Sequence, residues 1–169
     1  SVLRAAFGVL GYQTTDVHDR GHGGDTTEFI LNNFFTNEFL LLDKTFDRSV
    51  LIMFEVRNSS VAQTPLATII QQHIDYWRRA NGAGFWCPAV TAPPSGGEPA
   101  GSNTTAGNVN AWIRANGHRY TPKVIDLERI PEFSPSGSVL NPTMYSDDVH
   151  LTDAGYAVLA ARVLAAIIT

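Results

Sequence analysis

The chain has little of what marks several large classes of protein. Its 169 residues include one cysteine, Cys87, which excludes an internal disulfide framework and a cysteine-rich zinc site. Lysine and arginine number 12 against 16 aspartates and glutamates, so no basic stripe is available for nucleic-acid phosphates. The longest apolar stretch, 156–168, is interrupted by Arg162 and is shorter than the roughly 20 residues that cross a bilayer. We therefore expect no nucleic-acid partner and no membrane span.

Apolar residues make up 44% of the chain, which is enough to fill the core of a single domain over 1–169. Segments typical of strands alternate with segments typical of helices, and this alternation predicts an α/β fold with a parallel sheet covered by helices on both sides. The predicted strands are 14–18, 50–56, 84–90 and 123–127. The predicted helices are 27–42, 65–81, 105–116 and 153–168.

Some details of these segments follow from local chemistry. The run 50–56 is rich in β-branched and aromatic residues, which is typical of a strand buried on both faces. Thr64 is predicted to cap the second helix, 65–81, and Thr152 the last helix, 153–168. The last helix is predicted to bury one apolar face: Tyr156, Leu159, Ala160, Val163, Leu164 and Ile167. The proline-, glycine- and serine-rich segment 91–103 predicts a mobile surface loop or lid, too polar to pack.

The strongest signal for catalysis lies just before the last helix, at Asp147, Asp148 and His150. A carboxylate three residues before a histidine can fold back and accept a hydrogen bond from the imidazole, which fixes the tautomer of a catalytic base. Both aspartates compete for this role, and the spacing favours Asp147. The alternative is a polar loop in which Asp148 or Thr152 caps the helix.

Two turns offer groups that can stabilise negative charge. The segment 19–27 is a glycine-rich turn between a predicted strand and a helix, where backbone amides can approach an anion. It fails the spacing of dinucleotide and P-loop motifs, so no nucleotide cofactor is expected. Asn58 follows the strand 50–56, and its side-chain amide can donate to an oxyanion. Asn58 could equally serve turn geometry, or carry a glycan in Asn58-Ser59-Ser60.

Taken in chain order, these motifs resemble the SGNH/GDSL hydrolase family. The blocks of that family supply a serine in Gly-Asp-Ser, then a glycine, an asparagine and an Asp-x-x-His pair. Asp147 and His150, followed by Leu-Thr-Asp-Ala-Gly-Tyr, match the last block, and Gly24 matches the second. The third block, Gly-x-Asn-Asp, keeps only Asn58. The resemblance implies a three-layer α/β/α sandwich with a parallel, flavodoxin-like sheet.

Ser1 occupies the place of the family's nucleophile. The strand and the Gly-Asp that precede this serine in the family are not in the sequence, and that strand normally lies inside the sheet. We therefore expect an upstream segment or a companion chain to complete the domain, because neighbouring strands would otherwise keep unpaired backbone groups.

The resemblance implies a serine esterase. Ser1 would attack the ester, His150 would act as general base, Asp147 would orient it, and Gly24 and Asn58 would stabilise the oxyanion. No metal or organic cofactor is expected. The substrate would be a small-molecule or carbohydrate ester, with O-acetyl groups on carbohydrate favoured by the polar segment 91–103.

Two alternatives stay open. One is a non-catalytic carbohydrate-binding or structural module on a hydrolase-like fold, which the altered third block favours. The other is an N-terminal nucleophile hydrolase, in which the α-amine of Ser1 acts as base for its own hydroxyl. The second leaves Asp147 and His150 without a role.

Overall fold

The computed structural model describes residues 18, 22–39, 42, 49–96, 99–134 and 140–168. They divide into two compact units. The described residues within 20–92 and 99–126 form a larger unit, and those within 93–98 and 127–169, with residue 18, form a smaller one. The prediction of a single domain stays a prediction.

Parallel pairing organises the larger unit. The strands β1 (Ala89–Val90) and β2 (Val124–Ile125) pair in parallel, with Ala89 opposite Val124. A parallel bridge between Val50 and Trp86 adds the segment around Val50 on the other side of the β1 chain segment. There the Leu51 N–H donates to the Trp86 carbonyl at 3.1 Å. Parts of three predicted strands therefore lie side by side, but 84–90 and 123–127 are strands only at Ala89–Val90 and Val124–Ile125, and 50–56 pairs only around Val50. The fourth predicted strand, 14–18, lies outside the described residues except for its last position.

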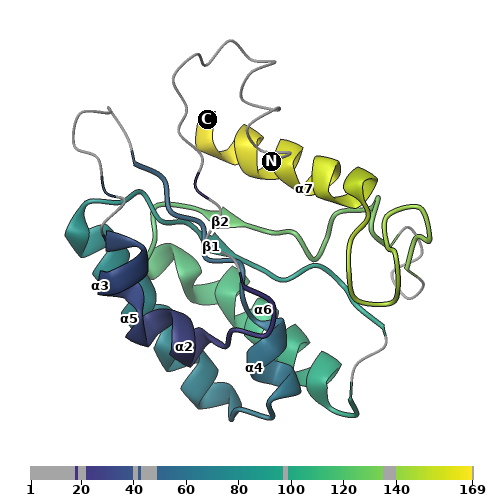
Figure 1. Ribbon diagram of the computed structural model, residues 1–169, viewed down its shortest axis with the longest axis horizontal. Helices are drawn as coiled ribbons and strands as arrows, with labels where there is room; N and C mark the ends of the chain where they lie inside the picture. The colour runs from purple at the N-terminus through teal and green to yellow at the C-terminus, as the bar shows by residue number, and fades with distance from the viewer. Residues whose placement is uncertain are drawn as a thin grey trace. The chain divides into compact units, whose positions relative to one another are not determined.

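Helices cover one side of these strands in the larger unit (Figure 1). They are α2 (Thr27–Asn32), α3 (Phe34–Asn37), α4 (Arg57–Val61), α5 (Leu66–Ala83) and α6 (Ser102–Asn116), followed by the 3₁₀ turn η2 (Gly117–Arg119). The long helix α5 contacts both α2 and α6. It places Trp77 and Ile69, both fully buried, in a core with Phe34, Cys87 and Val109.

The ends of α5 follow from its sequence. Gly84 adopts a φ of 109°, a left-handed conformation that suits glycine, and its N–H donates to the carbonyls of Ala80 and Asn81. At the other end Pro65, not the predicted Thr64, is the N-cap, with an extended backbone (ψ 137°). The Pro65 carbonyl accepts the N–H groups of Thr68 and Ile69, so the turn forms without a side-chain cap.

The prediction of one continuous helix over 27–42 is wrong. It is broken at Asn33 into α2 and α3. The Asn33 side-chain amide donates to the carbonyl of Phe29 at 2.8 Å, and the Asn33 N–H donates to the same oxygen. Asparagine competes in this way for helix carbonyls, which explains the break.

The run 50–56 is also not buried on both faces. Met53 and Glu55 are buried, whereas Phe54 between them is 45% exposed. This alternation is that of a segment with one buried face, and the apolar composition concealed it because Phe54 is large and hydrophobic.

The smaller unit contains α7 (Asp153–Ile168), which begins and ends where the sequence predicted. The predicted cap is confirmed, because Thr152 Oγ1 accepts the Gly155 N–H at 3.2 Å. Ala160, Val163 and Leu164 are buried on its apolar face, but Tyr156 is 44% exposed, so that part of the predicted face is wrong. Among the described residues, no helix combines the length and the apolar character needed to cross a membrane.

The predicted loop 91–103 is packed at both ends. Thr91, Ala92 and Pro93 are buried, and Ser102 is the buried first residue of α6. Asn110 of α6 explains the order at Ala92: its side chain donates to the Ala92 carbonyl and accepts the Ala92 N–H, both at 2.9 Å. The expectation that the whole segment is too polar to pack is therefore wrong.

We expect Asn110→Ala to lower the free energy of unfolding by about 2–4 kcal/mol, because it leaves two buried backbone groups of Ala92 without partners. Urea denaturation would measure the change. Asn116→Ala, on the same helix, is the matched control, since Asn116 makes one side-chain bond to the carbonyl of Trp112. Its effect should stay within about 0.5 kcal/mol, and equal losses in both variants would contradict the role of Asn110.

Candidate active site

Asp147 and His150 form a hydrogen-bonded pair in the smaller unit. The Asp147 Oδ2 lies 2.9 Å from the His150 Nδ1. The other carboxylate oxygen, Oδ1, accepts the backbone N–H groups of Val149 (2.7 Å) and His150 (2.6 Å). One side chain thus closes the turn and meets the imidazole. Both side chains are exposed, His150 by 73% and Asp147 by 57%.

These bonds shift the titration of the carboxyl group. The His150 N–H, the His150 ring and the Val149 N–H, in that order, lower the pKa of Asp147 from 3.8 to about 2. Asp147 therefore stays ionised at neutral pH, and its carboxylate accepts a hydrogen bond from the Nδ1–H of His150. The Nε2 atom of His150 is then the nitrogen left to act as a base.

Among the described residues, the hydrogen bond and ion pair of the His150 ring are with Asp147 and not with Asp148. The Asp148 backbone carbonyl accepts the Gly96 N–H at 2.6 Å. The helix is capped by Thr152, which leaves Asp148 no capping role. Spacing therefore predicted the correct partner for His150, which is Asp147.

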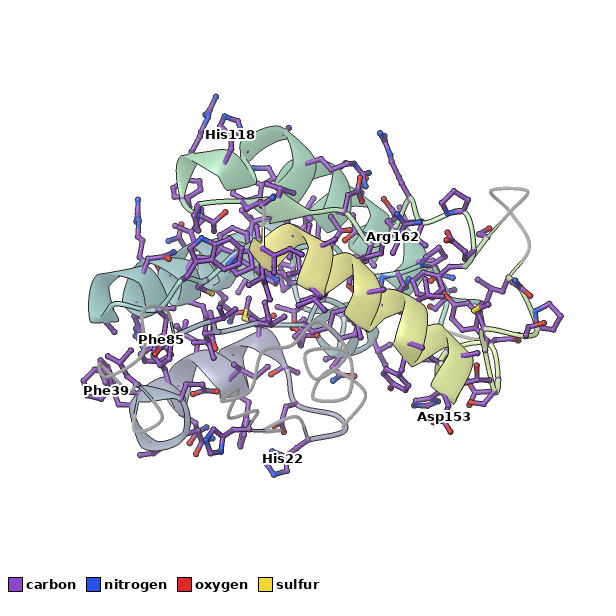
Figure 2. The ribbon with its side chains drawn as sticks, turned by 90° about the horizontal axis from the view of Figure 1, so that it is seen from above. His22, Phe39, Phe85, His118, Asp153 and Arg162 are labelled. Carbon is purple, nitrogen blue, oxygen red and sulfur yellow. The ribbon has the colours of Figure 1, made fainter. Side chains whose placement is uncertain are left out.

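A short antiparallel contact holds the turn in place. Tyr145 bridges Leu151, and the Ser146 N–H donates to the His150 carbonyl at 2.8 Å. The next bond runs from the Thr152 N–H to the Met144 carbonyl. The start of α7, where Asp153 is labelled in Figure 2, packs against this contact through Gly155. A Cβ atom on Gly155 would collide with the Met144 carbonyl and would lie 3.1 Å from the Leu151 Cβ.

In the larger unit, the two predicted turns lie together. Gly24 is exposed and has a φ of 91°, in the turn just before α2. Asn58 is the second residue of α4, and its Nδ2 donates to the carbonyl of Asp25 at 2.8 Å. Asn58 and the residue after Gly24 are therefore in direct contact.

The predicted nucleophile, Ser1, lies outside the described residues. The Asp147–His150 pair belongs to the smaller unit, and Gly24 and Asn58 belong to the larger one. The assembly of these groups into one site is accordingly part of the proposal below. In the part of the chain that the structure describes, no three His, Cys, Asp or Glu side chains gather as a metal site would require.

Sequence reasoning missed three buried polar residues beside Asn58. Thr27 Oγ1 donates to a carboxylate oxygen of Glu55, and Ser59 donates to the same carboxylate through its hydroxyl (2.9 Å) and its N–H (3.0 Å). The one available signal was Glu55 itself, an acid inside the apolar run 50–56. Its partner Thr27 is 28 residues away in sequence, which no local pattern reveals.

Cys87 is buried, as predicted, but it lies just before β1 and not within a strand. Burial raises the pKa of its thiol to about 12, so the sulfur stays protonated at neutral pH and is no nucleophile. Of the other described histidines, only His73 differs from His150 in exposure. His73 is fully buried, whereas His22 and His118 stand at the outer surface (Figure 2).

Several solved structures share this fold. A GDSL-like lipase from Bacteroides thetaiotaomicron VPI-5482 matches with a TM-score of 0.77 at 18% identity, over 98% of this chain and 80% of that one. An acetyl xylan esterase, AlAXEase, matches with a TM-score of 0.74 at 12% identity, over 98% and 88%. The psychrotrophic esterase EstA from Pseudoalteromonas sp., in a structure inhibited by monoethylphosphonate, matches with a TM-score of 0.67 at 10% identity, over 98% and 83%. The predicted α/β fold of the SGNH hydrolase type is confirmed.

The sequence itself identifies the family. A model of the GDSL-like lipase/acylhydrolase family matches residues 2–158, and the chain therefore belongs to this family of ester-hydrolysing enzymes. No curated protein matches the chain. The parallel pairing of β1 and β2 in this fold argues against an N-terminal nucleophile hydrolase, which is built on antiparallel sheets.

We expect Gly155→Ala to destabilise the protein by about 1–3 kcal/mol, since the added methyl group collides with the Met144 carbonyl. Urea denaturation would measure the loss, and the imidazole NMR signals of His150 should shift with it. In Gly107→Ala, on α6, the new methyl group meets nothing within 4 Å. The Gly107→Ala control should be more stable than the wild type by about 0.5–1 kcal/mol. A Gly155→Ala variant that is also more stable than the wild type would refute the close packing at Gly155.

The Asp147 carboxyl should titrate near pH 2. Because its pKa is lowered on folding, the stabilisation it provides is complete above about pH 3.8 and is lost as the pH falls through about 2. Carboxyl ¹³C NMR would measure the midpoint. In His150→Phe the ring donor is lost, so the midpoint should rise toward its ordinary value. A wild-type midpoint near 3.8 would contradict the observed hydrogen bonds.

Proposed function

We propose that the protein is a serine esterase that hydrolyses carboxylic esters with Ser1, His150 and Asp147. The observation that carries this proposal is the hydrogen bond between Asp147 and His150, which fixes the orientation of the imidazole ring before substrate binds. The alternative of a polar loop without chemistry does not explain why one carboxylate makes both backbone bonds and the bond to the ring. The family match supports ester hydrolysis as the reaction.

The reaction proceeds in two halves. Ser1 Oγ attacks the ester carbonyl while His150 Nε2 takes the hydroxyl proton, and the same proton passes to the departing alcohol as the acyl-enzyme forms. Water then attacks the acyl-enzyme with His150 again as base, which releases the acid and restores Ser1. Throughout, Asp147 holds the ring and stabilises its positive charge.

Gly24 and Asn58 stabilise the oxyanion of each tetrahedral intermediate. The backbone N–H of Gly24 lies in the turn before α2, and an asparagine amide carries two N–H groups. One N–H of Asn58 Nδ2 donates to the Asp25 carbonyl, so the other can serve the substrate while the side chain stays fixed. Loss of one such donor costs about 3–4 kcal/mol in the transition state.

The substrate we propose is an O-acetyl ester on a carbohydrate. The polar loop that suggested it is in part packed, so this argument now rests on the likeness in fold to an acetyl xylan esterase. Nothing in the structure or in the family match supports a companion chain. A non-catalytic binding module stays the second candidate, because Ser59 stands where the third block has an aspartate.

Ester hydrolysis by the full-length protein should be abolished in His150→Ala, with the fold unchanged by circular dichroism, since the variant removes the general base. Hydrolysis of p-nitrophenyl acetate measures the rate. His118→Ala is the matched control, because His118 is also exposed. An organophosphonate should label Ser1 in the control but not in the His150 variant. More than a few per cent of residual rate, or labelling elsewhere, would overturn the assignment, and an inactive wild type would favour the binding module.

A further inference from the structure

The buried network around Glu55 has no part in the mechanism above. Glu55 is 7% exposed, and its partners Thr27 and Ser59 are fully buried. Its carboxylate accepts the Thr27 hydroxyl, the Ser59 hydroxyl and the Ser59 N–H. The Thr27 N–H donates to Ser59 Oγ at 3.0 Å, so the hydrogen bonds among Thr27, Glu55 and Ser59 form a closed set. Such a set of donors offsets the cost of burying a carboxylate.

The backbone of Glu55 is fixed from a second direction. His73 of α5 places Nε2 2.8 Å from the Glu55 carbonyl oxygen and Nδ1 2.9 Å from the Ile69 carbonyl oxygen. His73 is 1% exposed, and burial lowers its pKa. A neutral imidazole carries one N–H, so His73 donates to one of these two carbonyls. The Glu55 main chain thus lies against His73 of α5, and the Glu55 side chain is hydrogen-bonded to Thr27 and Ser59.

The network joins the two turns that carry the proposed oxyanion donors. Thr27 is the first residue of α2, three positions after Gly24. Ser59 directly follows Asn58 in α4. The bond from Asn58 Nδ2 to the Asp25 carbonyl also links these two turns, and the place where they meet is called the junction below. Hydrogen bonds are directional, so a closed set of them fixes the relative placement of the two turns more tightly than apolar contact alone.

We propose that Thr27, Glu55 and Ser59 are positioning residues that set the Gly24 N–H and the Asn58 amide at the separation an oxyanion requires. This inference rests on the proposed function of Gly24 and Asn58. In the family pattern the carboxylate of the third block directly follows the asparagine. In this chain Ser59 stands there, and the carboxylate at the junction comes from Glu55.

The test compares two buried threonines with the same substitution. Thr27→Val removes the hydroxyl that Glu55 accepts, and Thr121→Val removes one that donates to the carbonyls of Gly117 and Lys123. Both variants should lose thermal stability. Only Thr27→Val should lower kcat, by about tenfold or more with KM nearly unchanged, because misplaced donors weaken the transition state and not ground-state binding. Thr27→Ser, which restores the hydroxyl, should recover kcat.

A spectroscopic readout makes the test independent of catalysis. The side-chain amide signals of Asn58 should shift in Thr27→Val and stay in place in Thr121→Val. If both variants keep the wild-type kcat and the wild-type Asn58 signals, the positioning role is wrong. If the wild type has no esterase activity, the proposed function fails, and the Asn58 signals alone decide the positioning role.

A second pair covers the case in which Thr27→Val does not fold. Ser59→Ala removes the hydroxyl that links Thr27 to Glu55, whereas Ser60→Ala removes a bond to the Val56 carbonyl within the same helix. Both serines are fully buried. The Asn58 signals should shift in the Ser59 variant alone, with the same loss of kcat. Equal behaviour of the two variants would overturn the inference.

Discussion

Parallel pairing of short backbone segments is the constraint on which the larger unit depends. The segments at Val50, Trp86–Val90 and Val124–Ile125 run in the same direction, so the residues that follow them emerge at one edge. The structure shows this directly, because Thr91 after β1 donates its hydroxyl to Asp126 after β2 at 3.0 Å. The turn into Asn58 follows the first of these segments. The sheet edge thereby determines where polar groups can collect.

The protein positions polar groups in two physically different ways. Asp147 and His150 are exposed, and their geometry comes from neighbours within three residues, through backbone N–H groups that the carboxylate itself accepts. Glu55 is buried, and its geometry comes from Thr27 and Ser59, held by long-range packing. The Asp147–His150 pair is local in sequence and open to water, so solvent and salt weaken its electrostatic interaction. The Glu55 network is shielded from water and forms only when the core is complete.

This difference explains what the sequence could predict. The bounds and cap of α7, and the choice of Asp147 over Asp148, follow from spacing along the chain and were predicted correctly. The break at Asn33 was missed because an asparagine inside a helical pattern can either continue the helix or compete for its carbonyls. The exposure of Phe54 was missed because it depends on what packs over that face of the segment. The Thr27–Glu55 contact could not be predicted, because Glu55 stands out as an acid in an apolar run but its partner Thr27 is 28 residues away in sequence.

The burial of Cys87 has a practical consequence. The chain has a single thiol, and that thiol lies in the core with a pKa of about 12. Alkylating dyes and spin labels react with thiolates, so Cys87 does not react with them while the protein is folded. A cysteine introduced on an exposed helix position would then carry a fluorophore or nitroxide alone, without first replacing the natural one.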